Sequence, residues 1–144
     1  MKRADSNKAK AAKPDFEIVL SPRGGFLISL NVTDPPTHVK GRFSMSALER
    51  FCEHKGVKNL LELISIITLG MSIDDYAQLV FEGIRDNYRE DMTQCPWSKQ
   101  RVKDEILDVT GFGNNEILGL FRHAIGRVAS LLPAGDEGEK KSPE

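Results

Sequence analysis

The sequence predicts a mainly α (α+β) fold, in which a small N-terminal β-hairpin is followed by about five helices in a compact bundle. Residues 16–43 are rich in β-branched and aromatic residues and contain a turn with proline and two glycines. Residues 46–132 repeat apolar residues at three- and four-residue steps, as one side of a helix requires. Glycine, proline and capping residues divide this second region into separate helices.

One globular domain, residues 15–132, is expected between two disordered ends. Residues 1–14 form a polar, basic arm, and residues 133–144 form a charged tail that leans acidic. Segments with so few apolar residues cannot bury enough surface to fold. A chain of 144 residues usually forms a single domain with its own core.

The hairpin, residues 16–43, begins with strands at Phe16–Leu20 and Phe26–Asn31. The turn between them is Ser21-Pro22-Arg23-Gly24-Gly25, a composition typical of a hairpin connection. Two consecutive prolines then end the second strand, because proline has no N–H to donate to a ladder. Residues His38–Phe43 can add a short third strand. A sheet of this size needs the helices to pack against it.

The first two helices are short and have recognisable ends. Ser46 and Glu49 have the capping-box spacing, so the first helix is expected over Ala47–Lys55, just before Gly56. The second covers Asn59–Leu69 and is apolar on most of its sides. Such a helix is covered by neighbours on more than one side.

The segment Ser72–Tyr88 has the clearest helical period and is expected to organise the domain. Ser72 is a suitable N-cap. Asp74 and Asp75 place negative charge at the positive end of the helix dipole. We expect a helix from Ile73 to about Tyr88, and its apolar stripe is Ile73, Tyr76, Ala77, Val80, Phe81, Ile84 and Tyr88.

Two further helices complete the domain. The fourth is expected to start at Cys95-Pro96-Trp97, with Pro96 in its first turn, and to run on through Ser98–Asp108. The last is expected over Glu116–Leu132, capped by Asn114 or Asn115.

No residue pattern indicates catalysis. His38, His54 and His123 lie on different elements and, together with Cys52 and Cys95, match no zinc-ligand spacing. The chain contains no nucleophile elbow and no phosphate-binding loop. We therefore expect no enzyme activity, no cofactor and no metal. The absence of a disulfide framework or a long apolar run predicts a cytoplasmic protein without a membrane partner.

The apolar excess of the second predicted helix points to a protein-binding role instead. Its apolar residues outnumber what one helical face can bury, so some are expected to contact a second copy or another protein. The candidate partner-binding residues are Leu60, Leu63, Ile64 and Ile67. Self-association is expected, and an outward-facing position such as Ile67 would carry it.

A nucleic-acid-binding regulator is an alternative. Lys99, Arg101 and Lys103 lie together on the fourth predicted helix and could contact a phosphate backbone. However, Asp104, Glu105 and Asp108 lie on the same helix, and the formal net charge of the chain is -1. Nucleic acid is therefore not the expected partner. A structural connector within a virion is a further alternative.

The order of the elements resembles the small tail assembly chaperones of long-tailed bacteriophages over about residues 16–132. The resemblance lies in a hairpin followed by short helical signatures and an apolar C-terminal helix. These signatures are Ser46-Ala47-Leu48-Glu49-Arg50-Phe51, Leu60-Leu61-Glu62-Leu63-Ile64, the helix Met71–Arg85 and the segment Val102–Leu107.

The resemblance implies a non-enzymatic chaperone. Its partners would be the tape-measure protein, whose apolar stripe it would keep soluble, and the tail-tube protein, which it would help to recruit. It would act in the cytoplasm of the host bacterium and would be absent from the mature virion.

Overall fold

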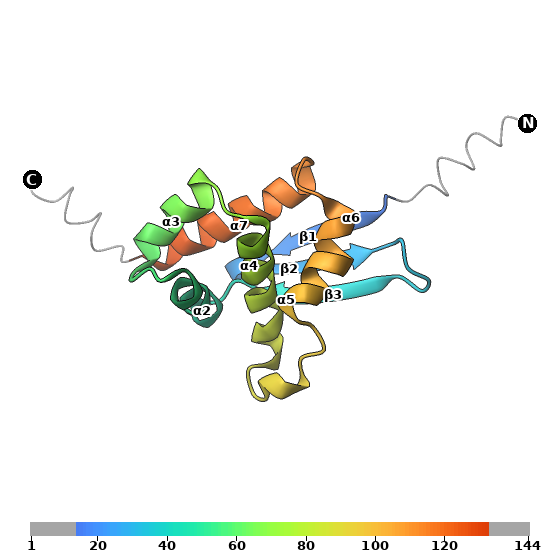
Figure 1. Cartoon of the computed structure of the whole chain (residues 1–144), viewed down its shortest axis with the longest axis horizontal. Helices are drawn as coiled ribbons and strands as arrows, with labels where there is room; N and C mark the ends of the chain where they lie inside the picture. The colour runs from blue at the N-terminus through green and yellow to red at the C-terminus, as the bar shows by residue number, and fades with distance from the viewer. Residues whose placement is uncertain (1–13, 133–144) are drawn as a thin grey trace, which may run out of the picture.

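The computed structural model describes residues 14–132, and it begins with a three-stranded antiparallel sheet in the order β1-β2-β3 (Figure 1). The strands are β1 Phe16–Ser21, β2 Gly25–Leu30 and β3 Thr37–Arg42. The predicted hairpin is confirmed, and β3 is the short third strand that residues His38–Phe43 were expected to add. The predicted basic arm and charged tail lie outside the described residues, except for Pro14.

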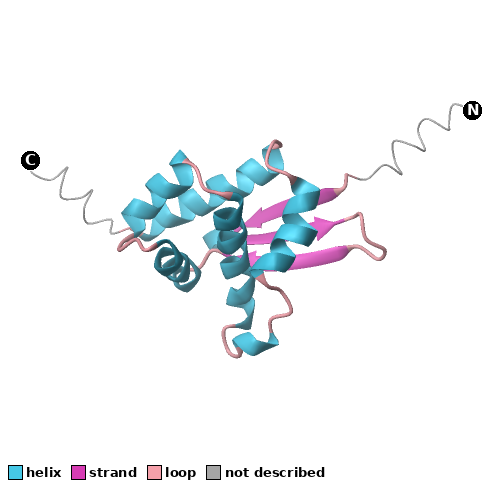
Figure 2. Cartoon of the chain, viewed as in Figure 1, coloured by secondary structure: helices cyan, strands magenta, loops and turns pink. Residues whose placement is uncertain are grey.

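The sheet has one covered face and one open face. Phe26, Ile28 and Val39 are at most 2% exposed, whereas Val19 is 60% exposed on the other side. Figure 2 shows the helices gathered on one face and at one end of the three strands. The structure is therefore a helical layer on a small sheet, consistent with the α+β class that the sequence predicts.

Five helices follow the sheet within residues 45–131, as expected. Three of them are α2 Met45–Lys55, α3 Leu60–Leu69 and α4 Ile73–Arg85. The fourth is one continuous run of α5 Lys99–Arg101, the π-helical η4 Val102–Leu107 and α6 Asp108–Thr110. The last is α7 Asn115–Leu131, and the short 3-10 turns are η1 Pro22–Gly24, η2 Asp86–Tyr88 and η3 Met92–Gln94. No helix among the described residues is both long and apolar enough to cross a membrane.

The helix α4 is central, as its periodicity predicts. It packs against α2, β3 and the η4 segment, and Ala77, Leu79, Val80 and Ile84 are at most 1% exposed. Gly83 lets the sheet come close, since a Cβ there would lie 2.9 Å from a ring carbon of Phe26. Two positions of the predicted stripe differ: Ile73 begins the helix and is 60% exposed, and Tyr88 lies beyond the end of α4, in the 3-10 turn η2.

Two predicted helix starts are wrong. Ser44, not Ser46, caps α2: its hydroxyl accepts a hydrogen bond from the Ala47 N–H at 3.1 Å and donates to Asp86 at 2.6 Å. The fourth helix starts at Lys99 with Ser98 as its cap. Pro96 lies before this helix because the residue that precedes a proline is driven to an extended conformation. The predicted cap at Ser72 is confirmed as a full capping box with Asp75.

Two buried carboxylates, one in α4 and one at the start of η2, bind side chains of neighbouring elements. Glu82 and Asp86 are 4% and 2% exposed. Glu82 accepts hydrogen bonds from Arg50 of α2 at 2.6 Å and from Gln78 at 2.7 Å. Asp86 pairs with Arg89 at 2.7 Å in addition to its bond from Ser44. Buried charges of this kind persist only when they are paired and hydrogen-bonded, so these contacts are structural.

Candidate functional site

The predicted partner-binding residues do not share one accessible surface. Leu63 and Ile67 are 0% and 5% exposed and belong to the core, while Leu60 and Ile64 are half-buried against it. The expectation that Ile67 faces outward is wrong. The reason is that α3 packs this side against α7 and α2, so a partner cannot contact Leu63 or Ile67 while the domain is folded.

The accessible apolar residues of this region are different ones. Leu61 is 63% exposed and Leu69 is 85% exposed, on the side of α3 that faces away from the core. Ile73, just past the turn that follows α3, is 60% exposed. We call Leu61, Leu69 and Ile73 the α3 surface. Ser65 and Thr68, also exposed, separate the two leucines.

A cleft of about 350 Å³ adjoins the start of α3, where the chain passes from α2 into α3. Met45, Val57 and Leu60 supply its apolar wall, and charged side chains such as Glu49 and Lys58 also line it. Met45 is 48% exposed. The predicted partner-binding residue Leu60 thus lines this cleft.

The cysteine in this cleft is not poised for chemistry. Burial raises the pKa of the Cys52 thiol, and the negative charges of Glu49, Glu62 and Glu53 raise the pKa further. Because the thiolate is the reactive and metal-binding form, Cys52 remains a protonated thiol at neutral pH. The cleft is suited to contact with an apolar side chain rather than to nucleophilic attack.

One group of possible metal ligands occurs among the described residues. His54, Asp74 and Asp75 offer ligand atoms within 4.8 Å of one another. However, both acids already have cationic partners: Asp75 binds Lys55 at 2.9 Å, and Asp74 binds two lysines of the fourth helix. A metal ion would have to displace these lysines. The group is a network of ion pairs that joins α2 and α4 to the fourth helix.

The same network uses the residues of the nucleic-acid alternative. Lys99 and Lys103 lie 2.9 and 3.0 Å from Asp74. Arg101 pairs with Glu105 at 2.7 Å and lies over the Trp97 ring at 4.1 Å. All three cations are engaged within the protein, so this helix offers little free positive charge to a phosphate backbone.

Sequence reasoning did not distinguish the covered side of α3 from its exposed side. The helical period separates Leu61 and Leu69 from Leu63 and Ile67, yet both sets are apolar, and only the packing against α7 decides which set is covered. Comparisons with protein-family models, curated proteins and solved structures found no match.

Proposed function

We propose that this protein is a non-enzymatic phage tail assembly chaperone, which binds the tape-measure protein through its α3 surface and helps to recruit tail-tube subunits. The observation that carries the proposal is the exposure of Leu61, Leu69 and Ile73. The client and the site of action, the cytoplasm of the host bacterium, come from the resemblance of the sequence.

The α3 surface suits a helical client. Large apolar residues that stay exposed are typical of surfaces that receive the apolar face of an amphipathic helix. Each leucine or isoleucine that a client covers contributes roughly 1.5–3 kcal/mol before the costs of association. Three such side chains support reversible binding, as a chaperone that must release its client requires.

The test measures binding to helical segments of the tape-measure protein encoded with this chain. Labelled peptides that span its apolar stripes are titrated with the full-length protein, and fluorescence anisotropy reports binding. Because one lost leucine contact removes about 1.5 kcal/mol, Leu61→Glu and Leu69→Glu should each weaken binding about tenfold or more.

The matched control is Val19→Glu. Val19 is 60% exposed, close to the 63% of Leu61, but it lies on the open face of the sheet. This variant has the same charge change and should bind like the parent protein. Equal loss in all three variants, or none in the α3 variants, would contradict the proposed surface.

A further inference from the structure

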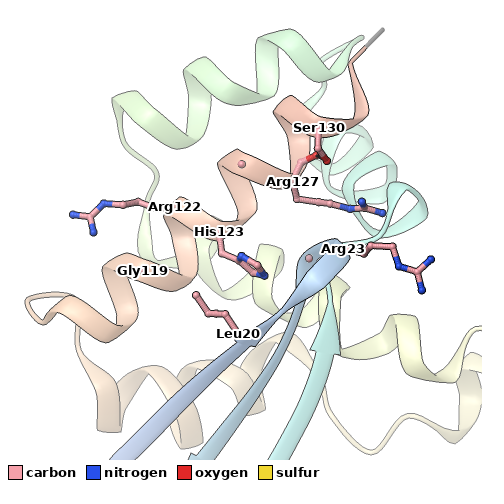
Figure 3. Close-up of a pocket in the computed structure, with 9 residues that line it drawn as sticks. Leu20, Arg23, Gly119, Arg122, His123, Arg127 and Ser130 are labelled. Carbon is pink, nitrogen blue, oxygen red and sulfur yellow. Dashed lines mark hydrogen bonds between the residues drawn. The ribbon is translucent and has the colours of Figure 1, made fainter. Parts of the chain in front are cut away.

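A second groove lies on another part of the molecule, between the β1–β2 turn and α7. Its volume is about 750 Å³. Figure 3 shows Arg122, His123 and Arg127 projecting from α7, with Arg23 on the turn beside them. Leu20 and Ser130 also line the groove. The groove is open to solvent, and four of its nine lining residues are basic.

On the α7 side of this groove, two of the lining residues are glycines and have no side chain. Gly119 and Gly126 lie about one turn on either side of His123 and line the groove. A Cβ at either glycine would meet no atom within 4 Å. The backbone of α7 is therefore accessible to an extended polypeptide at these two positions.

The arginines at this end of the molecule differ from the others in the described residues. Four arginines elsewhere pair with carboxylates: Arg50, Arg85, Arg89 and Arg101. By contrast, no carboxylate within residues 14–132 forms an ion pair with Arg23, Arg42, Arg122 or Arg127. Within residues 14–132, positive charge that forms no ion pair is thus gathered at this groove, although Asp86, Glu90 and Asp91 line a neighbouring hollow with Arg23 and Arg42 and the whole chain has a formal net charge of -1.

The surrounding backbone holds two of the basic side chains in place. The Nε of Arg127 donates to the Phe43 carbonyl at 3.0 Å, and no hydrogen bond to residues 14–132 engages its two terminal nitrogens. The Nε2 of His123 lies 3.1 Å from the Ser21 carbonyl and 3.0 Å from the Gly25 carbonyl. Burial lowers the pKa of Arg127, and the charges of Arg42 and Arg23 lower it further. A bound anion would relieve this crowding of like charges.

We propose that this groove binds an acidic, carboxylate-rich segment of a partner polypeptide. Arginine is well suited to this role because its planar guanidinium can donate two parallel hydrogen bonds to one carboxylate. In Figure 3, the guanidinium of Arg122 points away from those of Arg23 and Arg127. A single small anion cannot contact both ends of the groove, whereas a chain with several carboxylates can.

The length of the groove supports an extended segment. Arg122 and Arg127 are five positions apart, which corresponds to about 7.5 Å along a helix. An extended chain advances about 3.3 Å per residue, so at least about three residues are needed to cross it. The lining includes no Phe, Tyr or Trp side chain. Single-stranded nucleic acids rely on such side chains for base stacking, so the groove fits an acidic peptide better than a nucleic acid.

The test uses the full-length protein and a fluorescein-labelled ten-residue peptide of alternating Glu and Ser. Fluorescence anisotropy in low salt should show saturable binding, and a peptide of alternating Gln and Ser should bind at least tenfold more weakly. Arg122→Glu and Arg23→Glu should each weaken acidic-peptide binding about tenfold. Both arginines are exposed, so neither change should disturb the core.

Lys58→Glu is the matched control, because it makes the same charge change at the cleft next to α3. Titrations of this variant are repeated at about 0.1 M salt, where charges more than about 10 Å apart are largely screened, and there its dissociation constant should change less than twofold. Equal effects of Lys58→Glu and Arg122→Glu would overturn the assignment.

Two further experiments identify what binds in the groove. A ten-residue oligothymidylate should bind more weakly than the acidic peptide, and tighter binding would reassign the groove to nucleic acid. The chain itself carries Asp136, Glu137 and Glu139. If neutralising them with Asn and Gln tightened peptide binding tenfold, the chain's own residues would be the occupant and the partner assignment would fail. The site is independent of the α3 surface, so Leu61→Glu should leave acidic-peptide binding unchanged.

Discussion

Replacing Arg50 with Met should destabilise this domain strongly, because it would leave the buried carboxylate of Glu82 without its main cationic partner. The Glu82 side chain is 5% exposed and that of Arg50 is 20% exposed, and the two groups lie 2.6 Å apart. Without Arg50, the buried carboxylate would keep only Gln78 at 2.7 Å and Arg85 at 3.4 Å.

The expected cost follows from this geometry. Removing one partner of a buried ion pair typically costs about 3–5 kcal/mol. Because Arg50 is partly exposed and Arg85 remains, we expect Arg50→Met to lower the free energy of unfolding by about 2–3 kcal/mol. For a domain of this size, the midpoint of thermal unfolding should fall by roughly 6–15 °C.

Urea unfolding, followed by circular dichroism, measures the effect. In the double variant Arg50→Met/Glu82→Gln, the uncompensated charge is gone, so it should recover at least about 1 kcal/mol relative to Arg50→Met. Arg101→Met is the control, because Arg101 and Glu105 form an exposed pair, and it should cost at most about 1 kcal/mol. If Arg50→Met stays within about 0.5 kcal/mol of the parent protein, or the double variant gains nothing, the reasoning fails.

Two further predictions concern pH and assembly. Hydrogen bonds from Lys99 and Lys103 lower the pKa of Asp74 from its ordinary value of 3.8 to about 2. A lowered folded-state pKa stabilises the protein above the ordinary value, so this contribution should be complete above pH 3.8 and lost as the pH falls through about 2. A carboxyl titration by NMR checks this, and a midpoint of 3.8 or higher for Asp74 would contradict the two lysine contacts. Self-association remains a prediction, and the exposure of Leu69 makes Leu69→Glu the suitable variant in place of the buried Ile67. Light scattering should show a mass above the 16.0 kDa monomer that falls in Leu69→Glu, and a monomeric mass for the parent protein across micromolar concentrations would refute it.

Local signals in the sequence predict most of the element boundaries. Ser72 and Asp75 lie one turn apart, so their capping box depends on few other contacts. Gly56, with φ of 75°, ends α2 in a left-handed conformation that favours glycine. Asn114 accepts a hydrogen bond from the Ile117 N–H at 2.8 Å and caps α7. These features depend on neighbouring residues, so they can be predicted without knowledge of the tertiary structure.

The features that sequence reasoning missed depend on distant residues. Ser44 acts as the cap of α2 partly because it also bonds Asp86, 42 positions later. The choice of covered side on α3 depends on α7. The groove between the β1–β2 turn and α7 brings Arg23 near Arg122 and Arg127. Arg23 lies about a hundred positions before the other two in the sequence, so no local pattern relates them.

The binding of tape-measure segments to the α3 surface tests the central claim most directly. Anisotropy titrations compare the parent protein with Leu61→Glu, Leu69→Glu and Val19→Glu, and circular dichroism verifies that each variant is folded. The account predicts saturable binding that weakens about tenfold or more in the two α3 variants and is unchanged in Val19→Glu. Failure of the folded parent protein to bind any segment of the tape-measure protein would contradict the account.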